Sequence, residues 1–167
     1  QRAIDTVADL VPVREIQQQN GYVGLLTTNG VTLLGSQAVE VTFTPTRTIT
    51  ADMTFASGAL GGLSIGGAPV NLTSAVGRLD GGAIGASFAM RDQTLVEVQS
   101  GLDNFAGDLI ARFQDPANDP SLAAGDLGLL TDEGGVLDVT DIPGLAGRIA
   151  INPAVDPDAG GQTSLLR

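Results

Sequence analysis

The sequence predicts an α+β fold, in which antiparallel β-hairpins pack with or beside a pair of helices, the second of them long. Two Asn-Gly pairs flanked by β-forming residues indicate hairpins, and apolar residues alternate with polar ones from Val39 to Phe55. Apolar residues then recur every three or four positions from Leu95 to Leu109, which indicates a helix. We expect four parts: the end of a helix at 1–11, an antiparallel β lobe at 12–75, a long helix at 80–115, and an irregular tail with short elements at 116–167.

The first segment is expected to be the end of a helix that continues from upstream. Its apolar residues share one helical face, and no capping residue precedes them: Ile4, Val7, Ala8 and Val11. The helix should end near Val11, because Pro12 disfavours helical geometry in the residue before it. The chain is therefore interpreted as a fragment whose natural N-terminus lies further upstream.

The β lobe is predicted from turn residues and alternation. Asn20-Gly21 and Asn29-Gly30 each mark a hairpin, because Asn-Gly readily adopts the positive φ angles of tight turns. Strands at 39–44 and 49–55 should pair through a turn at 45–47, with one apolar and one polar face. A shorter pair is expected around Gly66-Gly67.

The long helix is expected to bury an apolar stripe, which consists of Leu95, Val98, Leu102, Phe105, Leu109 and Phe113. Such a stripe is more often the core of its own chain than a seam for a partner, and it serves as both if other helices complete a bundle. The other faces should carry the polar residues Asp92, Gln99, Asp103, Asp108 and Arg112. The tail is poorly periodic, and its segment 145–151 fits either a short strand or a helical turn.

Composition excludes several functions. The chain has 8 basic and 19 acidic residues, a net charge of −11, so nucleic acids and anionic membranes are disfavoured partners. It has no Cys and no His, which excludes disulfides, thiol catalysis, the usual zinc sites and Ser-His-Asp triads. No apolar run is long enough for a membrane helix, and no cleaved signal peptide is visible.

The remaining motifs assign no catalytic, cofactor-binding or metal-binding residue. Gly81, Gly82 and Gly85 match neither the dinucleotide nor the P-loop spacing, and they instead permit a turn and close packing. The acidic stretches at 115–126 and 156–161 offer oxygen ligands for calcium, but their spacing is not that of an EF-hand, and Asp also favours plain turns. Asn71 begins an N-glycosylation pattern, which also occurs by chance.

Six segments, taken in order, resemble the flagellar hook-associated proteins of the hook–filament junction, in the form found in alphaproteobacteria. They are "QRAIDTVADLVPV" (1–13), "QNGYVGLLTTNGVTLL" (19–34), "TPTRTITADMTFASGALGGLSIGG" (44–67), "GGAIGASFAMRD" (81–92), "LIARFQDPANDPSL" (109–122) and "GLAGRIAINPAVDPDAGG" (144–161). The likeness covers nearly the whole chain. It implies that this chain is the central part of a protein of that family.

The resemblance implies a secreted structural protein of the bacterial flagellum that joins hook to filament, serves flagellum assembly and motility, and is not an enzyme. It implies export without a cleaved signal peptide and no cofactor. Expected partners are other copies and neighbouring junction proteins, with an export chaperone as a further partner; the chain alone should be monomeric. It also implies that Gly81, Gly82 and Gly85 form a turn between the β lobe and a helix, and that this helix packs against the first one. The alternatives are a secreted β-rich binding module with calcium as a stabiliser, and a hydrolase with two converging carboxylates.

Overall fold

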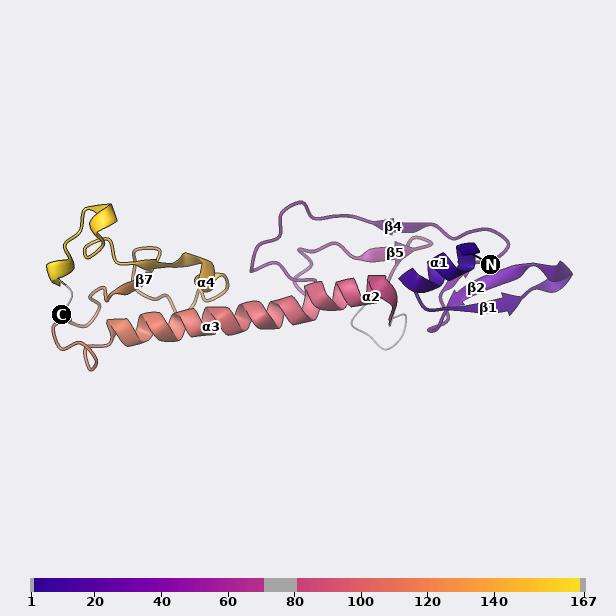
Figure 1. Ribbon diagram of the computed structural model, residues 1–167. Coiled ribbons are helices and arrows are strands. Elements are labelled where there is room, and N and C mark those ends of the chain that lie inside the picture. The colour runs from indigo at the N-terminus through magenta and orange to yellow at the C-terminus, as the bar shows by residue number, and fades with distance from the viewer. Residues whose placement is uncertain (1, 71–80, 166–167) are drawn as a thin grey trace. The chain divides into compact units, whose positions relative to one another are not determined.

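The computed structural model of the protein describes residues 2–70 and 81–165, so the glycosylation pattern at Asn71 lies outside the described residues. Its contacts divide the chain into two compact units. The N-terminal unit comprises Gln1–Ile49 and Met53–Leu95, and the C-terminal unit comprises Thr50–Asp52 and Val96–Arg167. Antiparallel sheets of two or three strands together with helices confirm the predicted α+β class (Figure 1).

The N-terminal unit begins with α1 (Arg2–Leu10), which ends just before Pro12 as expected. Three antiparallel strands follow in the order β1-β2-β3: β1 (Val13–Gln17), β2 (Val23–Thr27) and β3 (Thr32–Leu34). The 3-10 turn η1 (Gln19–Gly21) joins the first two strands, with Gln17 opposite Val23. Both predicted Asn-Gly hairpins are therefore confirmed.

The second hairpin uses its glycine, but not its asparagine, for the left-handed position. Gly30 has φ 83°, whereas Asn29 does not have a positive φ. The Gly30 N–H donates to the Thr27 carbonyl (3.0 Å), and the Thr27 N–H donates to the Val31 carbonyl (2.8 Å). This is a three-residue loop with glycine in the left-handed position, in place of the two-residue loop that Asn-Gly favours most.

A second sheet has the order β4-β5-β6 and comprises β4 (Val41–Phe43), β5 (Leu63–Ile65) and β6 (Ala68–Pro69). The expected pair around Gly66-Gly67 is β5–β6. The expected strand at 49–55 is wrong: these residues form no strand, and β4 pairs with β5. Polar side chains explain the failure, because Ser57 and Thr54 exchange hydrogen bonds of 3.0–3.1 Å with each other's backbone N–H, and Thr50 bonds Asp52. Such local bonds compete with a strand ladder.

The core of the N-terminal unit forms where α1 ends and α2 (Gly82–Ala89) begins. Val11, Leu63, Ile65 and Val70 are buried there, with Ile84 and Phe88 of α2 packed against them. Gly81 and Gly82 have φ of 93° and 64°. A Cβ on Gly82 would stand 2.7 Å from the carbonyl carbon of Leu10. The expected role of these two glycines in a close approach of the helices is confirmed.

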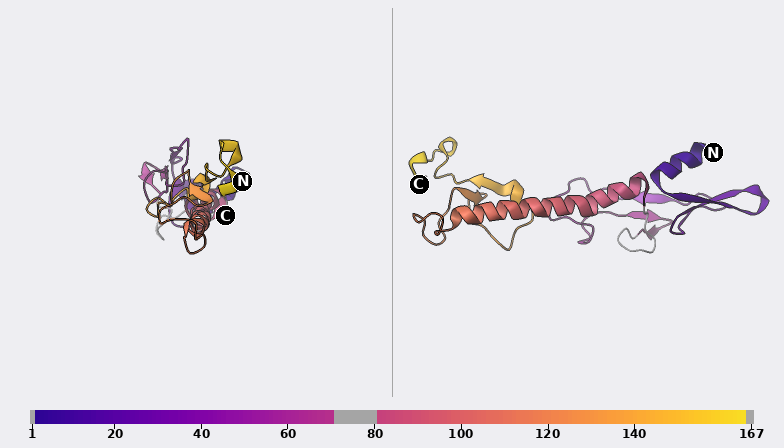
Figure 2. Two further views of the ribbon diagram at one scale, coloured as in Figure 1. Left: turned by 90° about the vertical axis from the view of Figure 1, so that its left-hand side faces the viewer. Right: turned by 60° about the horizontal axis from the view of Figure 1, so that its bottom comes forward.

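Helical structure continues from α2 through a π-helical turn, η2 (Met90–Thr94), into α3 (Leu95–Gln114) without a break (Figures 1 and 2). In an α-helix neighbouring side chains point apart. Here the Arg91 guanidinium nevertheless bonds the carboxylate of Asp92, with 2.9 Å between Nη2 and Oδ2. Arg91 also donates to the Gly61 carbonyl (3.0 Å) and lies 4.7 Å from the centre of the Phe88 ring. The predicted polar flank of this helix is therefore tied into the N-terminal unit.

The C-terminal unit pairs β7 (Leu130–Asp132) with β8 (Ile149–Ile151) beside the short helix α4 (Leu145–Arg148). Segment 145–151, for which the sequence left two interpretations open, is a helical turn followed directly by a strand. Two 3-10 turns end the described chain, η3 (Pro157–Ala159) and η4 (Thr163–Leu165). Ala106, Ile110 and Leu145 form the core of this unit.

Within residues 2–70 and 81–165, no helix is both long and apolar enough to cross a membrane.

We predict that Gly82→Ala lowers the free energy of unfolding by about 1–3 kcal/mol, because alanine tolerates neither the positive φ nor the Leu10 backbone beside it. Gly101→Ala is the matched control, since a Cβ there meets nothing within 4 Å in α3 and should stabilise the helix by up to about 1 kcal/mol. Urea denaturation followed by circular dichroism measures both variants. Equal stability of Gly82→Ala and the parent chain would contradict the close approach.

Candidate assembly surface

The buried face of α3 lies away from the predicted stripe, and it combines one large apolar residue with two small residues and a carboxylate. Asp103, Ala106, Gly107 and Ile110 are its buried residues. A Cβ on Gly107 would lie 3.4 Å from Cδ2 of Leu145, so a glycine at this position gives Leu145 room to lie against the helix. Ile110 and Leu145 are fully buried. The helix therefore contacts its own unit through a narrow strip centred on Ile110, which shares a core with Leu145 of α4.

Asp103 joins this face to the start of α4. One carboxylate oxygen accepts from the Gly144 N–H and the other from the Ala146 N–H, both at 2.8 Å. The Gln99 side-chain amide donates a third bond at 2.9 Å. Although it is only 2% exposed, the carboxylate thus has donors from two elements. The sequence placed Asp103 on a face other than the stripe, which is correct, and the structure shows that this face is the buried one.

The environment of Asp103 favours its charged form. Burial alone raises the pKa of this carboxyl, but hydrogen bonds from Ala146, Gly144 and Gln99, together with the nearby charge of Arg148, outweigh that effect. The net pKa of Asp103 lies below its ordinary value. Because the folded state holds the proton more weakly than the unfolded chain, this group stabilises the fold above the ordinary pKa of Asp, and the contribution is lost as the pH falls through the folded-state pKa.

Arg148, the last residue of α4, holds the neighbouring turns in place. It forms an ion pair with Asp132 of β7 (2.9 Å) and a longer one with Asp141 (3.3 Å). Its guanidinium also donates to the Pro143 carbonyl at 2.9 Å. The hydrogen bonds that the guanidinium donates to the Asp132 carboxylate are the main cause that raises the pKa of Arg148 above its usual range. The loop that carries the Asp103 donors is thereby anchored to the sheet.

With Asp103 turned inward, the apolar stripe of α3 faces outward. Val98 is 53% exposed, Leu102 52%, Phe105 62% and Phe113 43%, while Leu109 is half-buried. Leu95, at the start of the helix, is 53% exposed. The expectation that this stripe forms the core of its own chain is wrong for these residues. A row of large exposed apolar residues on one helix face marks an interaction site.

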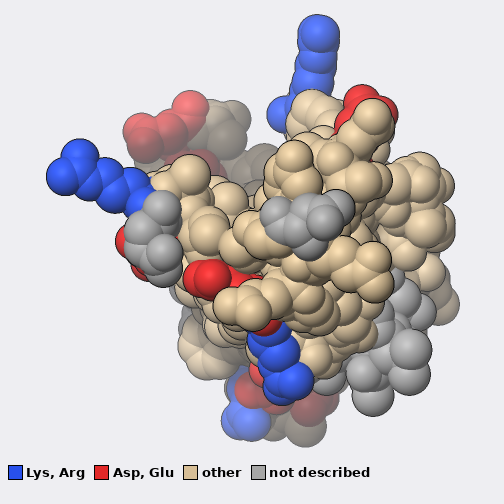
Figure 3. Space-filling model, turned by 90° about the vertical axis from the view of Figure 1, so that its right-hand side faces the viewer, with Lys and Arg blue, Asp and Glu red and all other residues tan. Residues whose placement is uncertain are grey.

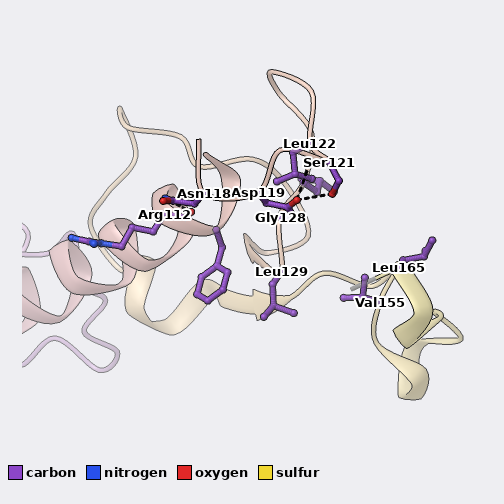
Figure 4. A pocket seen from close by; sticks show the side chains of 11 residues that line it. Arg112, Asn118, Asp119, Ser121, Leu122, Gly128, Leu129, Val155 and Leu165 are labelled. Carbon is purple, nitrogen blue, oxygen red and sulfur yellow. Dashed lines mark hydrogen bonds between the residues drawn. The ribbon is translucent and has the colours of Figure 1, made fainter. Parts of the chain in front are cut away.

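A pocket of about 430 Å³ lies where α3 ends (Figure 4). Phe113 lines it together with Leu122, Leu129, Val155 and Leu165. Its polar side chains are engaged locally: Asn118 donates to the Arg112 carbonyl (3.1 Å), and the Ser121 hydroxyl donates to Asp119 (2.6 Å). Asp119 is the one acidic residue among those that line it, so this pocket does not offer the carboxylate pair of the hydrolase alternative.

The acidic loops that suggested calcium use their carboxylates to close turns. Asp115, Asp119 and Asp156 each accept a backbone N–H from two residues further along the chain, at 2.9–3.0 Å. Asp138, which lies outside those loops, makes the same kind of turn at 2.8 Å. The hydrogen bonds from Thr140 lower the pKa of Asp138. Among the residues that the structure describes, no three acidic side chains gather closely enough to hold a metal ion. These contacts match the turn interpretation of the sequence.

The glycines before α2 serve packing. The space in front of Gly82 is filled by the backbone of Leu10 and Val11, and a Cβ on Gly81 would stand 3.0 Å from the Pro12 ring.

A hollow of about 380 Å³ further along α2 is lined by Phe43, Leu63, Ile84, Ser87, Phe88 and Arg91. Phe43 and Phe88 meet edge to face there, with ring centres 5.9 Å apart. Its lining is apolar apart from Ser87 and Arg91.

A row of large exposed apolar residues such as the one on α3 is typical of a chain that associates with other chains. Comparison with known families identifies the assembly: the family model described as "Flagellar hook-associated protein FlgK helical domain" matches residues 1–128. The chain belongs to this family of flagellar structural proteins, whose place is the bacterial flagellum. No curated protein and no solved structure matches the chain.

We predict that Asp103→Asn lowers the free energy of unfolding at neutral pH by about 1–3 kcal/mol, because a neutral amide cannot accept all three hydrogen bonds in a buried site. The difference from the parent chain should shrink below about pH 4, where the unfolded carboxyl is protonated. Urea denaturation across pH 3–8 measures it.

Asp108→Asn is the matched control for this experiment. Asp108 forms an exposed pair with Arg112 on the same helix at 2.7 Å, so its loss should change stability by less than about 0.5 kcal/mol at any pH. If both variants behaved alike, the buried carboxylate would not be the link between α3 and α4.

Proposed function

We propose that this chain is a non-catalytic building block of the hook–filament junction. We further propose that it joins a helix of the assembly through the part of the α3 stripe that lies in the C-terminal unit (Val98, Leu102, Phe105, Leu109 and Phe113), which is called the stripe from here on. The exposure of that stripe carries the proposal. Spacings of three and four residues present a seam that another helix can fill with knobs-into-holes packing. The family supplies the context, since its members are flagellar hook-associated proteins.

The finer details belong to the same proposal. The chain acts outside the cell after export without a cleaved signal peptide, and it is of the alphaproteobacterial type. Its partners are other copies of the protein and neighbouring junction proteins, with an export chaperone before assembly. In isolation the chain is monomeric, because a net charge of −11 opposes self-association. The absence of Cys supports export in an unfolded state, since no thiol can form a wrong bridge on the way.

We predict that the double variant Leu102→Asp and Phe105→Asp, placed in the full-length protein of the bacterium that makes it, abolishes swimming. In the assembly, burying two carboxylates in a helix seam is costly. In the chain alone both positions are more than half exposed, so the charges remain in water. The isolated chain should therefore keep its circular dichroism spectrum and its unfolding midpoint. Swimming in soft agar and the presence of the protein in purified flagella are the two measurements.

Val139→Asp is the control, because Val139 is 73% exposed and lies outside α3. A strain that carries Val139→Asp should swim like the parent strain. Normal swimming and normal incorporation of the double variant would show that the stripe is not the assembly surface.

A further inference from the structure

We propose that the partner docked on the stripe of α3 is a basic amphipathic helix, with Lys or Arg beside its apolar seam, rather than the same stripe of a second copy. The inference rests on the proposed function and adds the chemistry of the partner. It is carried by the distribution of charge between the two units and along the flank of the stripe.

Nearly all the excess negative charge belongs to the unit that carries the stripe. The described part of the C-terminal unit has thirteen Asp and Glu against two Arg, whereas the described part of the N-terminal unit has five against four. The two arginines in the described part of the C-terminal unit are already paired, Arg112 with Asp108 and Arg148 with Asp132 and Asp141. On the face viewed from the end of α1 and β1, uncharged residues cover most of the surface (Figure 3).

Acidic side chains also flank the stripe itself. At 3.6 residues per turn, Glu97 and Asp108 lie along the edge of the stripe that is remote from Asp103 and Ile110. Both are exposed, and the Glu97 side chain makes no hydrogen bond or ion pair with any other described residue. Flanking positions of a helical seam select partners by charge. A cation on the partner helix would therefore meet Glu97, and a second would compete with Arg112 for Asp108.

A second copy does not satisfy these charges. Stripe-to-stripe pairing would bring two strongly acidic units together, and their surfaces would approach within the screening length of about 8 Å at physiological salt. Like charges across an interface disfavour a partner, whereas opposite charges raise the association rate and fix the register. The apolar seam supplies affinity for any helix, and the acidic surroundings restrict that affinity to basic ones.

The test uses three designed helical peptides and the intact chain. Two peptides share one Leu/Ile heptad seam and differ in its flanks, which are Lys in one and Glu in the other; the third keeps the Lys residues and scrambles the seam. Fluorescence anisotropy of labelled peptide measures affinity in low and high salt. We expect the Lys-flanked peptide to bind at least about tenfold more tightly than either of the other two in low salt. High salt should lower the affinity of the Lys-flanked peptide.

Two variants of the chain separate docking on the stripe from general attraction to an acidic protein. Phe105→Asp should reduce binding of the Lys-flanked peptide at least about tenfold, whereas Val139→Asp, which adds the same charge elsewhere, should leave it unchanged. Equal binding of the Lys- and Glu-flanked peptides, or equal binding of the scrambled one, would overturn the inference. The inference would also be overturned if light scattering showed a concentration-dependent dimer of the chain that Phe105→Asp abolishes, since a second copy would then be the occupant.

These outcomes are distinguishable from failure of the proposed function. If the stripe variant stops swimming but the peptides show no charge preference, only the chemistry of the partner is wrong. If the variant swims normally while the Lys-flanked peptide is preferred, the stripe binds basic helices but is not required in the flagellum.

Discussion

The carboxylate of Asp103 connects α3 to the N-terminal end of α4 through the backbone N–H groups of Gly144 and Ala146. A buried carboxylate is costly unless its hydrogen bonds are satisfied, and here three donors surround it. Arg148 reinforces the arrangement by holding the same loop to β7. Because one face of α3 is committed to this contact, the stripe on another face is left for other chains.

Stability and association are thus separated on a single helix. The buried face combines Ile110 and two small residues with one charged group, so apolar packing and the bonds of Asp103 fix the orientation of the helix together. The large side chains, Leu102 and Phe105 among them, remain available to a partner. Their surroundings are acidic; negative charge in general favours solubility, and we propose that here it also restricts which helices can approach. An assembly component needs both properties, because it must remain unassociated until its partner is present.

Local signals in the sequence were sufficient for the fold class and for several elements. The Asn-Gly hairpins and the helix end before Pro12 depend on neighbouring residues, and they were predicted correctly. The strand at 49–55 failed because alternation does not reveal that threonine hydroxyls will bond nearby groups. The orientation of α3 could not be predicted, since the donors to Asp103 lie 41 and 43 residues away in a segment without periodicity. Apolar spacing found the stripe, but spacing alone does not say whether a chain covers its own stripe.

The orientation of α3 can be measured directly because the chain has no Cys. Adjacent residues Phe105 and Ala106 are 62% and 3% exposed, so single cysteines at these positions report on the two faces. We predict that Phe105→Cys reacts with a thiol reagent as fast as in urea, whereas Ala106→Cys is protected by at least about a hundredfold until the unit unfolds. Equal reactivity, or protection of Phe105→Cys instead, would contradict this prediction.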